Sequence, residues 1–501
     1  MEVQGKNILG FSNGEGAVKT FRTYNPKRNE ENHFVIEEAT EEMAYESVRK
    51  AHLAWEAYRF MPISRRAEFL RKIAESFRAE RVYLEQIFCL ESGLSEKRAA
   101  AELDRTCFQL EHFAKAIEQN QRLLPSESDS DEACFLNKRF LSLGPVVVFG
   151  ASNFPFAYST MGGDSASALA AGCPVIVKGH EMHAGTGDLV AQLVNRAAKE
   201  TKMPDGVFSN LNAKGHWLGA FLVKHELVKA VGFTGSIPGG MALYQIAQNR
   251  KEPIPFFAEM GSVNPIVVLP QKLKDEKEQL VTLIRDSMTL DAGQFCTNPG
   301  LVIGLASSEW DYLVHEMSAA VKAIAPQVMV HPDLYEKYYG GLERNVLLLQ
   351  EKGVNVELPE KTGIAEPFMV ELSAETFVSS QVLAEEVFGL HTLFVRCKDE
   401  AQLLEVLNNL AGQLTCSVFA SDSELKQYRS VFEWGMSHAG RMVLNGVPTG
   451  VTVDRDMHHG GPFPASSDSR FTAVGSDAIA RFLRPICFQG FSEKQLKELI
   501  S

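Results

Sequence analysis

The stretch GPVVVFGASNFPFAYS, residues 144–159, places the apolar run VVVF directly before a turn of glycine, alanine, serine and asparagine. From residue 145 onward, similar short runs rich in β-branched residues alternate with helical patterns; they lie at 175–177, 207–211, 226–233, 254–258 and 265–269. Fully apolar strands between helices are typical of a parallel sheet that helices cover on both faces. The sequence therefore predicts an α/β fold.

The chain contains a helical region before this stretch and a second alternation of strands and helices after it. Upstream, residues 40–119 carry apolar side chains at helical spacing, and LPSESDSDEA (124–133) then breaks the pattern as a turn or exposed arm. Downstream, a second alternation of apolar strands and helices follows Gly293, with strand patterns at 302–305, 392–396 and 417–420. We therefore expect two α/β domains in sequence.

The composition of the 501 residues disfavours several classes of protein. Apolar residues make up 45% and charged residues 23%, which is ordinary for a folded chain. The formal net charge of −13 disfavours attraction to nucleic acid or anionic lipid. The first twenty residues lack the basic start and apolar core of a signal peptide, and no apolar run is long enough to span a bilayer. We expect a cytoplasmic protein that binds neither nucleic acid nor membranes.

The cysteines single out one candidate nucleophile. Eight are scattered along the chain without a CxxC pair or a Cys/His cluster at zinc spacing, so we predict neither disulfides nor a metal site. Cys296 lies in DAGQFCTNPG (291–300), a loop rich in glycine and proline that follows a predicted helix. A substrate can reach a thiol in such a loop, and the loop N–H groups can stabilise a thiolate or an oxyanion. The alternative is a buried thiol that acts as a small hydrophobic group.

Two other polar residues follow predicted strands. Glu259 closes the strand IPFFA at a position where α/β proteins place their clefts, and there it can accept a proton from water. It can equally be a carboxylate paired with a Lys or Arg. Asn153 lies in the turn after VVVF and can donate its side-chain N–H to an oxyanion, although an Asn that simply favours the turn is the better interpretation of the residue alone.

A second group of residues is suited to bind phosphate and ribose. FTGSIPGG (233–240) follows a strand and opens a helix, so that a pyrophosphate can approach the helix N-terminus; the residues concerned are Gly235, Ser236 and Gly240. The spacing is not the usual Gly-x-Gly-x-x-Gly, and the signal is weak by itself. Lys178 ends another strand, where its ammonium can contact a ribose or phosphate, but a solvated Lys is the commoner case.

Taken together, six motifs resemble those of the aldehyde dehydrogenase superfamily in order and approximate spacing: ASNFP, VKGHE, FTGS, EMGSVNP, GQFCTNPG and EEVFG. The resemblance covers nearly the whole chain. The stretches NFPFAYSTMGGDSASALAAGCPVIVKGH and GGPFPASSDSRFTAVG look most similar to a branch with α-ketoglutaric semialdehyde (2,5-dioxovalerate) dehydrogenases and an NADP-dependent fatty-aldehyde dehydrogenase. The resemblance thus implies an enzyme that oxidises an aldehyde to a carboxylate.

The resemblance also implies a domain plan. Residues 1–123 and 143–258 correspond to a Rossmann-like NAD(P)-binding domain, and residues 259–465 to an α/β catalytic domain. Residues 124–142 correspond to a small oligomerisation arm, together with the C-terminal segment 466–501. Because members of the family usually form dimers or tetramers, we expect a homodimer or homotetramer.

By the same resemblance, three residues take catalytic roles. Cys296 matches the nucleophile, Glu259 the general base and Asn153 the donor to the oxyanion. The implied reaction is attack of the Cys296 thiolate on the aldehyde, hydride transfer to the nicotinamide, and hydrolysis of the thioester by water that Glu259 activates.

Other matches concern the coenzyme, NAD or NADP. Lys178 and Glu181 match the adenosine-ribose site, Ser236 the pyrophosphate contact, and Glu386 and Phe388 the nicotinamide-ribose region. An acidic side chain such as Glu181 can bind both ribose hydroxyls but repels a 2′-phosphate. The sequence therefore favours NAD over NADP.

A last group of candidate residues concerns the aldehyde substrate. His459, like its neighbour His458, precedes GGPFP in the region where the family builds its substrate mouth, and it can relay a proton or hydrogen-bond a polar substrate there. A solvent-facing loop His is an equally good interpretation. Arg455 is suited to pair with a substrate carboxylate, as is Arg470, although a surface Arg is the default. Phe156 and Phe463 suit an apolar aldehyde instead. We predict α-ketoglutaric semialdehyde as the substrate, with a fatty or other aliphatic aldehyde as the alternative.

Functions of other classes compete with this interpretation. A thiol-dependent hydrolase or acyltransferase would need a His paired with Cys296 and would leave the FTGS loop without a purpose. A CoA-acylating dehydrogenase would have less need of a water-activating Glu, and Glu259 is present. A non-catalytic relative should have lost Cys296, Glu259 or Asn153, and the chain keeps all three.

Overall fold

The computed structural model describes residues 1–119 and 136–500, and the chain falls into two compact units. Unit 1 comprises residues 1–258, 453–457 and 471–501, and unit 2 comprises residues 259–452 and 458–470. The segment 453–457, which the sequence placed in the second domain, clusters with unit 1. Its backbone lies so close to residue 475 that a Cβ at Gly475 would approach the carbonyl oxygen of Asp454 to 2.0 Å.

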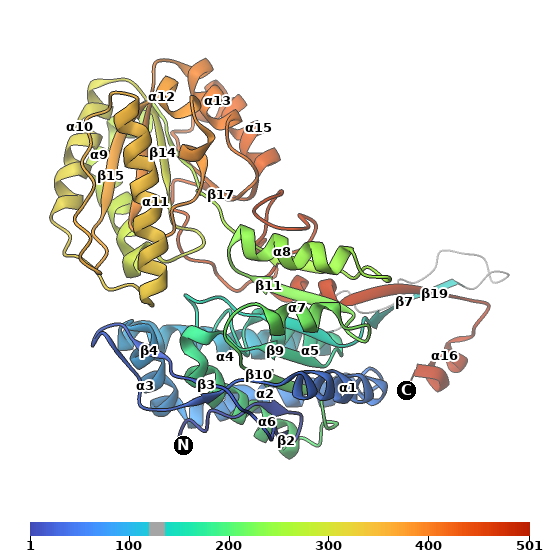
Figure 1. Ribbon diagram of the computed structural model, residues 1–501. Helices are drawn as coiled ribbons and strands as arrows, with labels where there is room; N and C mark the ends of the chain where they lie inside the picture. The colour runs from blue at the N-terminus through green and yellow to red at the C-terminus, as the bar shows by residue number, and fades with distance from the viewer. Residues whose placement is uncertain (120–135, 501) are drawn as a thin grey trace. The chain divides into compact units, whose positions relative to one another are not determined.

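Unit 1 contains a seven-stranded sheet (Figure 1). Its strands, in spatial order, are β12 (Phe256–Glu259), β11 (Ala230–Thr234), β8 (Val146–Phe149), β9 (Val175–Lys178), β10 (Phe208–Leu211), β1 (Ile8–Leu9) and β2 (Ser12–Asn13). The register pairs β8 with β9, β9 with β10 and β8 with β11 in parallel, whereas β1 joins β10 antiparallel. All four side chains of β8 are buried, as an apolar run between two helical layers requires.

The helices of unit 1 begin and end where the sequence supplies caps. Thr40 accepts a hydrogen bond from Met43 at the start of α1 (Glu41–Tyr58), and Ser95 does the same for Arg98 in α4 (Glu96–Glu118). Between them lie α2 (Ile63–Ala79) and α3 (Arg81–Ser92). Four helices follow strands of the sheet: α5 (Gly163–Ala171), α6 (Ala184–Glu200), α7 (Trp217–Lys224) and α8 (Ile237–Gln248).

A separate two-stranded ribbon joins β7 (Leu136–Ser142) to β19 (Leu483–Gln489) antiparallel, and α16 (Glu493–Ile500) follows it. Among residues 1–119 and 136–500, no further strand pairs with this ribbon. The first part of the predicted arm, 124–135, lies outside the described residues. Assembly through this arm remains a prediction.

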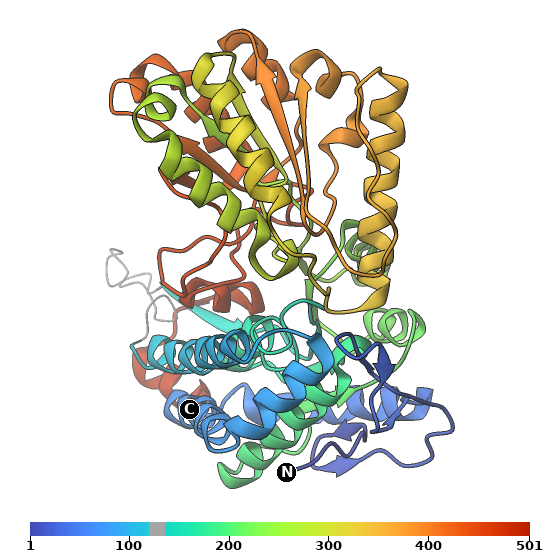
Figure 2. The same ribbon diagram turned by 90° about the vertical axis from the view of Figure 1, so that its left-hand side faces the viewer.

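Unit 2 contains a six-stranded sheet in which every pairing is parallel. In spatial order its strands are β15 (Phe368–Ser373), β16 (His391–Cys397), β14 (Leu301–Leu305), β13 (Ile266–Val268), β17 (Gln413–Phe419) and β18 (Ala439–Leu444). The main helices are α9 (Pro270–Thr289), α10 (Ser308–Lys322), α11 (Pro332–Glu351), α13 (Glu400–Asn408) and α15 (Arg429–His438). Figure 2 shows them packed around the sheet.

Side chains of β13 alternate between two cores in unit 2. Ile266 and Val268 pack with α9 and α10 in one apolar cluster, which includes the fully buried Trp310. Val267 points the other way and packs in a cluster with α13 and α15. This alternation is the pattern of a sheet covered on both faces.

The α/β prediction is confirmed by these two sheets. One predicted strand is too long: residues 226–229 form a turn that leads into β11, in which Val228 donates a backbone hydrogen bond to His225. Within the described part of the chain, no helix is long and apolar enough to cross a membrane.

Candidate active site

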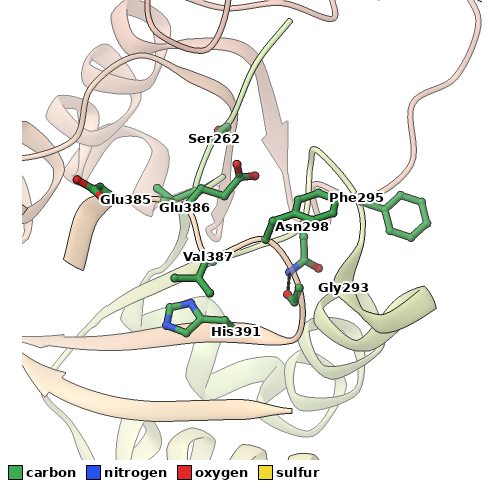
Figure 3. A pocket seen from close by; sticks show the side chains of 12 residues that line it. Ser262, Gly293, Phe295, Asn298, Glu385, Glu386, Val387 and His391 are labelled. Atoms are coloured by element: carbon green, nitrogen blue, oxygen red, sulfur yellow. Dashed lines mark hydrogen bonds between the residues drawn. The ribbon is translucent and has the colours of Figure 1, made fainter. Parts of the chain in front are cut away.

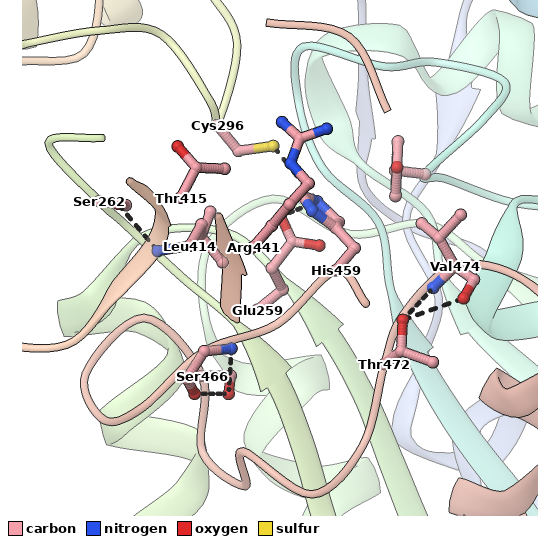
Figure 4. Close-up of polar contacts among 12 residues, drawn as sticks. Glu259, Ser262, Cys296, Leu414, Thr415, Arg441, His459, Ser466, Thr472 and Val474 are labelled. Atoms are coloured by element: carbon pink, nitrogen blue, oxygen red, sulfur yellow. Dashed lines mark hydrogen bonds and ion pairs between the residues drawn. The ribbon is translucent and has the colours of Figure 1, made fainter. Parts of the chain in front are cut away.

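Three chemically reactive side chains of unit 2 lie together (Figure 4). Glu259 ends β12, Cys296 lies in the loop before β14, and His459 lies in the segment 458–470. The Nε2 atom of His459 is 3.0 Å from Oε1 of Glu259 and 3.6 Å from Sγ of Cys296. The predicted nucleophile, the predicted base and the predicted His therefore form one cluster.

The cluster is shielded from solvent on its acid–base side. Glu259 is 4% exposed and His459 is 2% exposed, whereas Cys296 is partly exposed. Within the described residues, the Glu259 carboxylate lies at ion-pair distance from His459 Nε2 and interacts with the Cys296 thiol, but neither of its oxygens has a hydrogen-bond partner outside this cluster. A buried carboxylate in this state is ready to accept a hydrogen bond from water or substrate.

The backbone of segment 458–470 brings His459 to Glu259. Met260 donates a hydrogen bond of 2.8 Å to the carbonyl of Ala465, and Glu259 forms a β-bridge with Ser466. On its other side the segment lies close to β17, because a Cβ at Gly461 would come within 2.2 Å of the carbonyl oxygen of Gln413. Only glycine permits this approach, which explains why GGPFP follows the two histidines.

Asn264 fixes the Cys296 loop to the start of β13. Its Nδ2 donates to the carbonyl oxygens of Cys296 at 2.8 Å, Asn298 at 3.0 Å and Ser262 at 3.1 Å, and its Oδ1 accepts from Thr415 at 2.9 Å. Asn264 is fully buried and has φ of +48°, a left-handed conformation that Asn tolerates better than most residues. The side chain thus acts as a clamp that positions the nucleophile.

The other side of the Cys296 loop contacts the segment that carries Glu386. Gly293 has φ of +64°, and a Cβ there would approach the carbonyl oxygen of Gly389 to 2.3 Å. Asn298 donates to the same carbonyl at 3.1 Å. These contacts place Glu386 and Phe388 around a small pocket beside the loop, which Ser262, Asn298 and His391 also line (Figure 3).

The electrostatic setting opposes ionisation of Cys296. Burial raises the pKa of the thiol well above its usual value, and the charges of Glu259 and Glu386 raise it further. Arg441 of β18 acts in the opposite sense and lowers this pKa. Since the thiolate is the nucleophile, the free protein holds Cys296 mainly as the unreactive thiol at neutral pH.

Alkylation by iodoacetamide should report this state. We expect the rate at Cys296 to rise about tenfold per pH unit up to at least about pH 9, because the thiolate fraction rises in that proportion. Glu259→Gln removes a nearby negative charge, lowers the pKa and should accelerate the reaction roughly tenfold at a fixed pH. Mass spectrometry of the Cys296 peptide measures both rates, with exposed Cys487 as the internal control. A rate that levels off near neutral pH would contradict the raised pKa.

Burial also raises the pKa of Glu386, to about 8, while a backbone hydrogen bond from Ser262 opposes the shift. A carboxyl group with this pKa is largely protonated at neutral pH. It can donate a hydrogen bond in that form and accept several once it ionises.

The predicted phosphate and ribose residues lie at the carboxyl ends of parallel strands of unit 1. Ser236 follows β11 and caps α8, where its Oγ accepts from Gly239 at 3.4 Å. Gly235 forms the turn before it, and Gly240 is buried in the first turn of the helix. The exposed helix N-terminus offers N–H groups and a favourable dipole to an anion.

Lys178 ends β9 in the same sheet. Burial lowers its pKa, while the negative charges of Glu181 and Glu38 raise it. Glu181 accepts a hydrogen bond of 3.2 Å from the backbone of Gly215, which orients its carboxylate. A dinucleotide with a ribose near this Lys–Glu pair and a pyrophosphate at α8 therefore fits the residues present.

Asn153 lies in the turn after β8 and is buried in unit 1, where its carbonyl accepts from Arg98 at 3.3 Å. Cys296 belongs to unit 2, so the role of Asn153 at the oxyanion remains a prediction. A coenzyme site that combines the phosphate and ribose residues of unit 1 with Glu386 of unit 2 likewise remains a prediction.

The predicted substrate residues differ in their surroundings. Phe156 is 1% exposed and stacks on Phe88 at 4.9 Å between ring centroids, which favours a core role over the predicted substrate contact. Phe463 is 61% exposed and stays a candidate for the substrate mouth. Arg455 is exposed on the 453–457 segment of unit 1. Arg470 is exposed and pairs with Asp468 at 2.6 Å.

Sequence reasoning missed three residues of this site: Asn264, Gln413 and Arg441. Asn264 belongs to the EMGSVNP motif, but nothing in the spacing shows that its amide reaches three carbonyl groups. Gln413 accepts hydrogen bonds from Ser262 Oγ and from the backbone of Val263 and Asn264. Arg441 occurs in an ordinary strand pattern. Only the parallel order of β13, β17 and β18 brings them together.

The chain is similar to known proteins over almost its whole length. The model of the aldehyde dehydrogenase family matches residues 11–462. An alpha-ketoglutaric semialdehyde dehydrogenase of Acinetobacter baylyi is 37% identical, over 100% of this chain and 96% of its own. Alpha-ketoglutaric semialdehyde dehydrogenase 2 of Azospirillum brasilense is 40% identical, over 99% of this chain and 96% of its own.

Solved structures share the fold at lower identity. A 1-pyrroline-5-carboxylate dehydrogenase from Thermus, solved with bound NAD, has a TM-score of 0.81 and 21% identity, and the match covers 97% of this chain and 92% of the other. A betaine aldehyde dehydrogenase from Staphylococcus aureus has a TM-score of 0.83 and 19% identity, with 98% of each chain covered. These similarities concern the fold alone.

Proposed function

Because the chain belongs to the aldehyde dehydrogenase family, we propose that it oxidises α-ketoglutaric semialdehyde (2,5-dioxovalerate) to 2-oxoglutarate, with NAD as the hydride acceptor. The family membership confirms the resemblance inferred from the six motifs, and the enzyme is an oxidoreductase that acts on aldehydes with NAD(P). The observation that carries the choice of substrate is the similarity, over essentially the whole chain, to two relatives of that name.

In the proposed reaction Cys296 attacks the aldehyde carbon and forms a hemithioacetal. His459, with Nε2 at 3.6 Å from the sulfur, is suited to take the thiol proton. The developing oxyanion would be held by the Asn153 amide and the Cys296 backbone N–H, as the family resemblance implies. When bound, the coenzyme supplies the acceptor for the hydride.

The second half of the reaction hydrolyses the Cys296 thioester. Water attacks the carbonyl carbon, Glu259 takes the proton of that water, and the C–S bond breaks to release the carboxylic acid and the Cys296 thiolate. The buried Glu259 carboxylate, whose oxygens have no hydrogen-bond partner outside the cluster among the described residues, is suited to this role. His459, at 3.0 Å from Glu259, can exchange the proton onward.

The residues of unit 1 and unit 2 that match the coenzyme site support NAD binding. The Ser236 helix N-terminus suits the pyrophosphate, and the oriented carboxylate of Glu181 suits the two hydroxyls of an unphosphorylated ribose. Glu386 suits the second ribose. We therefore expect a preference for NAD over NADP.

Coenzyme affinity should depend on pH through Glu386. Its pKa is raised to about 8 in the free protein, and ribose hydroxyl donors favour the charged carboxylate, so binding lowers this pKa and releases a proton. The dissociation constant for NAD should therefore fall as the pH rises from about 6 to 8, by up to about tenfold per unit, and then level off. Titration of intrinsic fluorescence at several pH values measures the slope.

The matched variants are Glu386→Gln and Glu385→Gln. The first removes the titrating group and should abolish the pH dependence, whereas Glu385 is an exposed neighbour whose loss should leave the slope unchanged. A slope that persists in Glu386→Gln would assign the pH dependence to another group.

Arg441 supports the choice of an acidic substrate. Its charge reaches the Cys296 thiol, and it is half-buried, with its guanidinium oriented by the carbonyl oxygens of Pro448 and Gly450. A fixed guanidinium beside the nucleophile can bind the carboxylate of a semialdehyde acid in bidentate fashion.

The test compares α-ketoglutaric semialdehyde, succinic semialdehyde and a neutral aldehyde of similar length, each with NAD and NADP. We expect kcat/KM to favour the acidic semialdehydes and NAD. In Arg441→Gln, kcat/KM for the acidic semialdehydes should fall by about 10- to 100-fold more than kcat/KM for the neutral aldehyde. This factor corresponds to the loss of a charged hydrogen bond. Arg470→Gln is the matched control and should change little, because Arg470 is exposed and paired with Asp468.

Other outcomes would point elsewhere. Preference for a medium- or long-chain aldehyde would favour a fatty-aldehyde dehydrogenase and would remove the role of Arg441. Hydrolysis of a thioester or ester without reduction of either coenzyme would favour a thiol-dependent hydrolase.

A further inference from the structure

The cluster of Cys296, His459 and Glu259 combines three kinds of metal ligand. One sulfur, one imidazole nitrogen and one carboxylate oxygen all lie within 4.8 Å of one another. The residues are separated by 37 and 163 positions in the chain, which is why the spacing of cysteines and histidines predicted no zinc site. Tertiary structure, and not a local motif, brings the ligands together.

The distances suit a tetrahedral zinc ion. With Zn–S of about 2.3 Å and Zn–N of about 2.05 Å, two ligands of a tetrahedral centre lie about 3.5 Å apart. Cys296 Sγ and His459 Nε2 are 3.6 Å apart. For a nitrogen and a carboxylate oxygen the expected separation is about 3.4 Å, and His459 Nε2 and Glu259 Oε1 are 3.0 Å apart. A shift of a few tenths of an ångström at Glu259 would complete three of the four positions.

The chemistry of the ligands favours zinc over the hard cations. Thiolate and imidazole ligands select zinc, whereas Mg²⁺ and Ca²⁺ require sets of oxygen ligands. Glu259 adds an independent sign of a ligand site: its side chain is 4% exposed, yet among the described residues neither carboxylate oxygen has a hydrogen-bond partner other than the two further proposed ligands. The Asn264 clamp on the Cys296 carbonyl holds the thiol in place from outside the cluster.

We propose that Cys296, His459 and Glu259 form a reversible zinc site that inhibits the dehydrogenase. On binding, a Zn–S bond replaces the S–H bond of Cys296 and the proton passes to solvent, with no change of oxidation state. The ion then occupies both the nucleophile and the water-activating carboxylate. Three protein ligands leave the fourth position to water.

Cobalt is the probe, because Co²⁺ in a tetrahedral thiolate site gives a thiolate-to-metal charge-transfer band and intense visible bands. The full chain, reduced, freed of metal with a chelator and without coenzyme, should bind one Co²⁺ with these bands, and Zn²⁺ should abolish them. The same Zn²⁺ should inhibit aldehyde oxidation, and chelator should restore it. Because the spectrum is recorded without aldehyde or coenzyme, its outcome does not depend on which aldehyde is the substrate.

Variants distinguish the three-ligand site from Co²⁺ binding by any single thiol. Cys296→Ser, or wild-type protein alkylated at Cys296, should lack the charge-transfer band. His459→Gln and Glu259→Gln should each weaken Co²⁺ binding at least about 100-fold, more than the roughly 10- to 100-fold that an outer-shell partner costs. The exposed residues Cys487 and His315 provide matched controls, Cys487→Ser and His315→Gln, which should bind Co²⁺ like wild type.

Three results would overturn the proposal. The first is the absence of the charge-transfer band in wild type. The second is a charge-transfer band that persists, with unchanged affinity for Co²⁺, in both His459→Gln and Glu259→Gln. The third is loss of the band in Cys487→Ser with the circular dichroism of the fold intact.

Discussion

A Glu259→Gln variant is expected to release about one reduced coenzyme per active site in a fast burst and then to turn over about 10²- to 10⁴-fold more slowly than wild type. The reason is the division of roles proposed for the cluster. Cys296 and the coenzyme suffice to form the thioester, whereas its hydrolysis needs a base for water. Loss of that base makes hydrolysis rate-limiting, and the acyl-enzyme accumulates.

Stopped-flow absorbance of the reduced coenzyme measures the burst amplitude and the later steady rate. Because the neutral amide of the Glu259→Gln variant carries no charge to raise the pKa of Cys296, the burst itself should be at least as fast as in wild type. Cys296→Ser is the control and should show neither phase. If the burst disappeared together with turnover in Glu259→Gln, Glu259 would act before hydride transfer, as the base for the Cys296 thiol.

The sequence predicted the fold well because the signals of an α/β protein are local. The VVVF run of β8 and the apolar run of β13 are each shorter than a helix core and buried on both faces. Their character depends on side chains only a few positions apart. The boundary of β11 was less accurate, since the turn at residues 226–229 contains Leu and Val and carries no glycine or proline to mark it.

The site was predictable only where a residue stands at the end of such a local element. Cys296 and Glu259 fall at a loop after a helix and at the end of a strand, and the structure brings them together with His459. Asn264, Gln413 and Arg441 act through contacts between β13, β17 and β18, and the spacing along the chain contains no trace of those contacts. Phe156 shows the converse case: its place in a motif suggested a substrate contact, but its stacking on Phe88 belongs to the core.

Tertiary context also governs the C-terminal segment. The sequence suggested an arm for residues 466–501, and β19 does pair with β7. The preceding 3-10 helix η4 (Ser476–Phe482), however, returns to unit 1 and inserts Arg481 against α5. Arg481 is 4% exposed, and its guanidinium contacts Asp164 at 2.7 Å, Ser167 at 3.1 Å and the carbonyl of Ala478 at 3.2 Å.

Asp164→Ala should therefore destabilise unit 1 by about 3–5 kcal/mol, because it leaves the charge of Arg481 buried without its counter-ion. Urea unfolding, followed by circular dichroism and fluorescence, measures the change in the midpoint for unit 1. Asp164 also lies in the first turn of α5, so a part of the loss, about 0.3–1 kcal/mol, comes from the helix dipole.

A double variant separates the buried charge from the other contacts. Asp164→Leu combined with Arg481→Met removes both charges and keeps apolar volume, so it should be more stable than either single variant. Asp468→Ala is the matched control, since it breaks the exposed pair with Arg470 and should cost less than about 1 kcal/mol. If the double variant lost as much stability as the sum of the two single variants, the pair would contribute through independent packing and not through charge compensation.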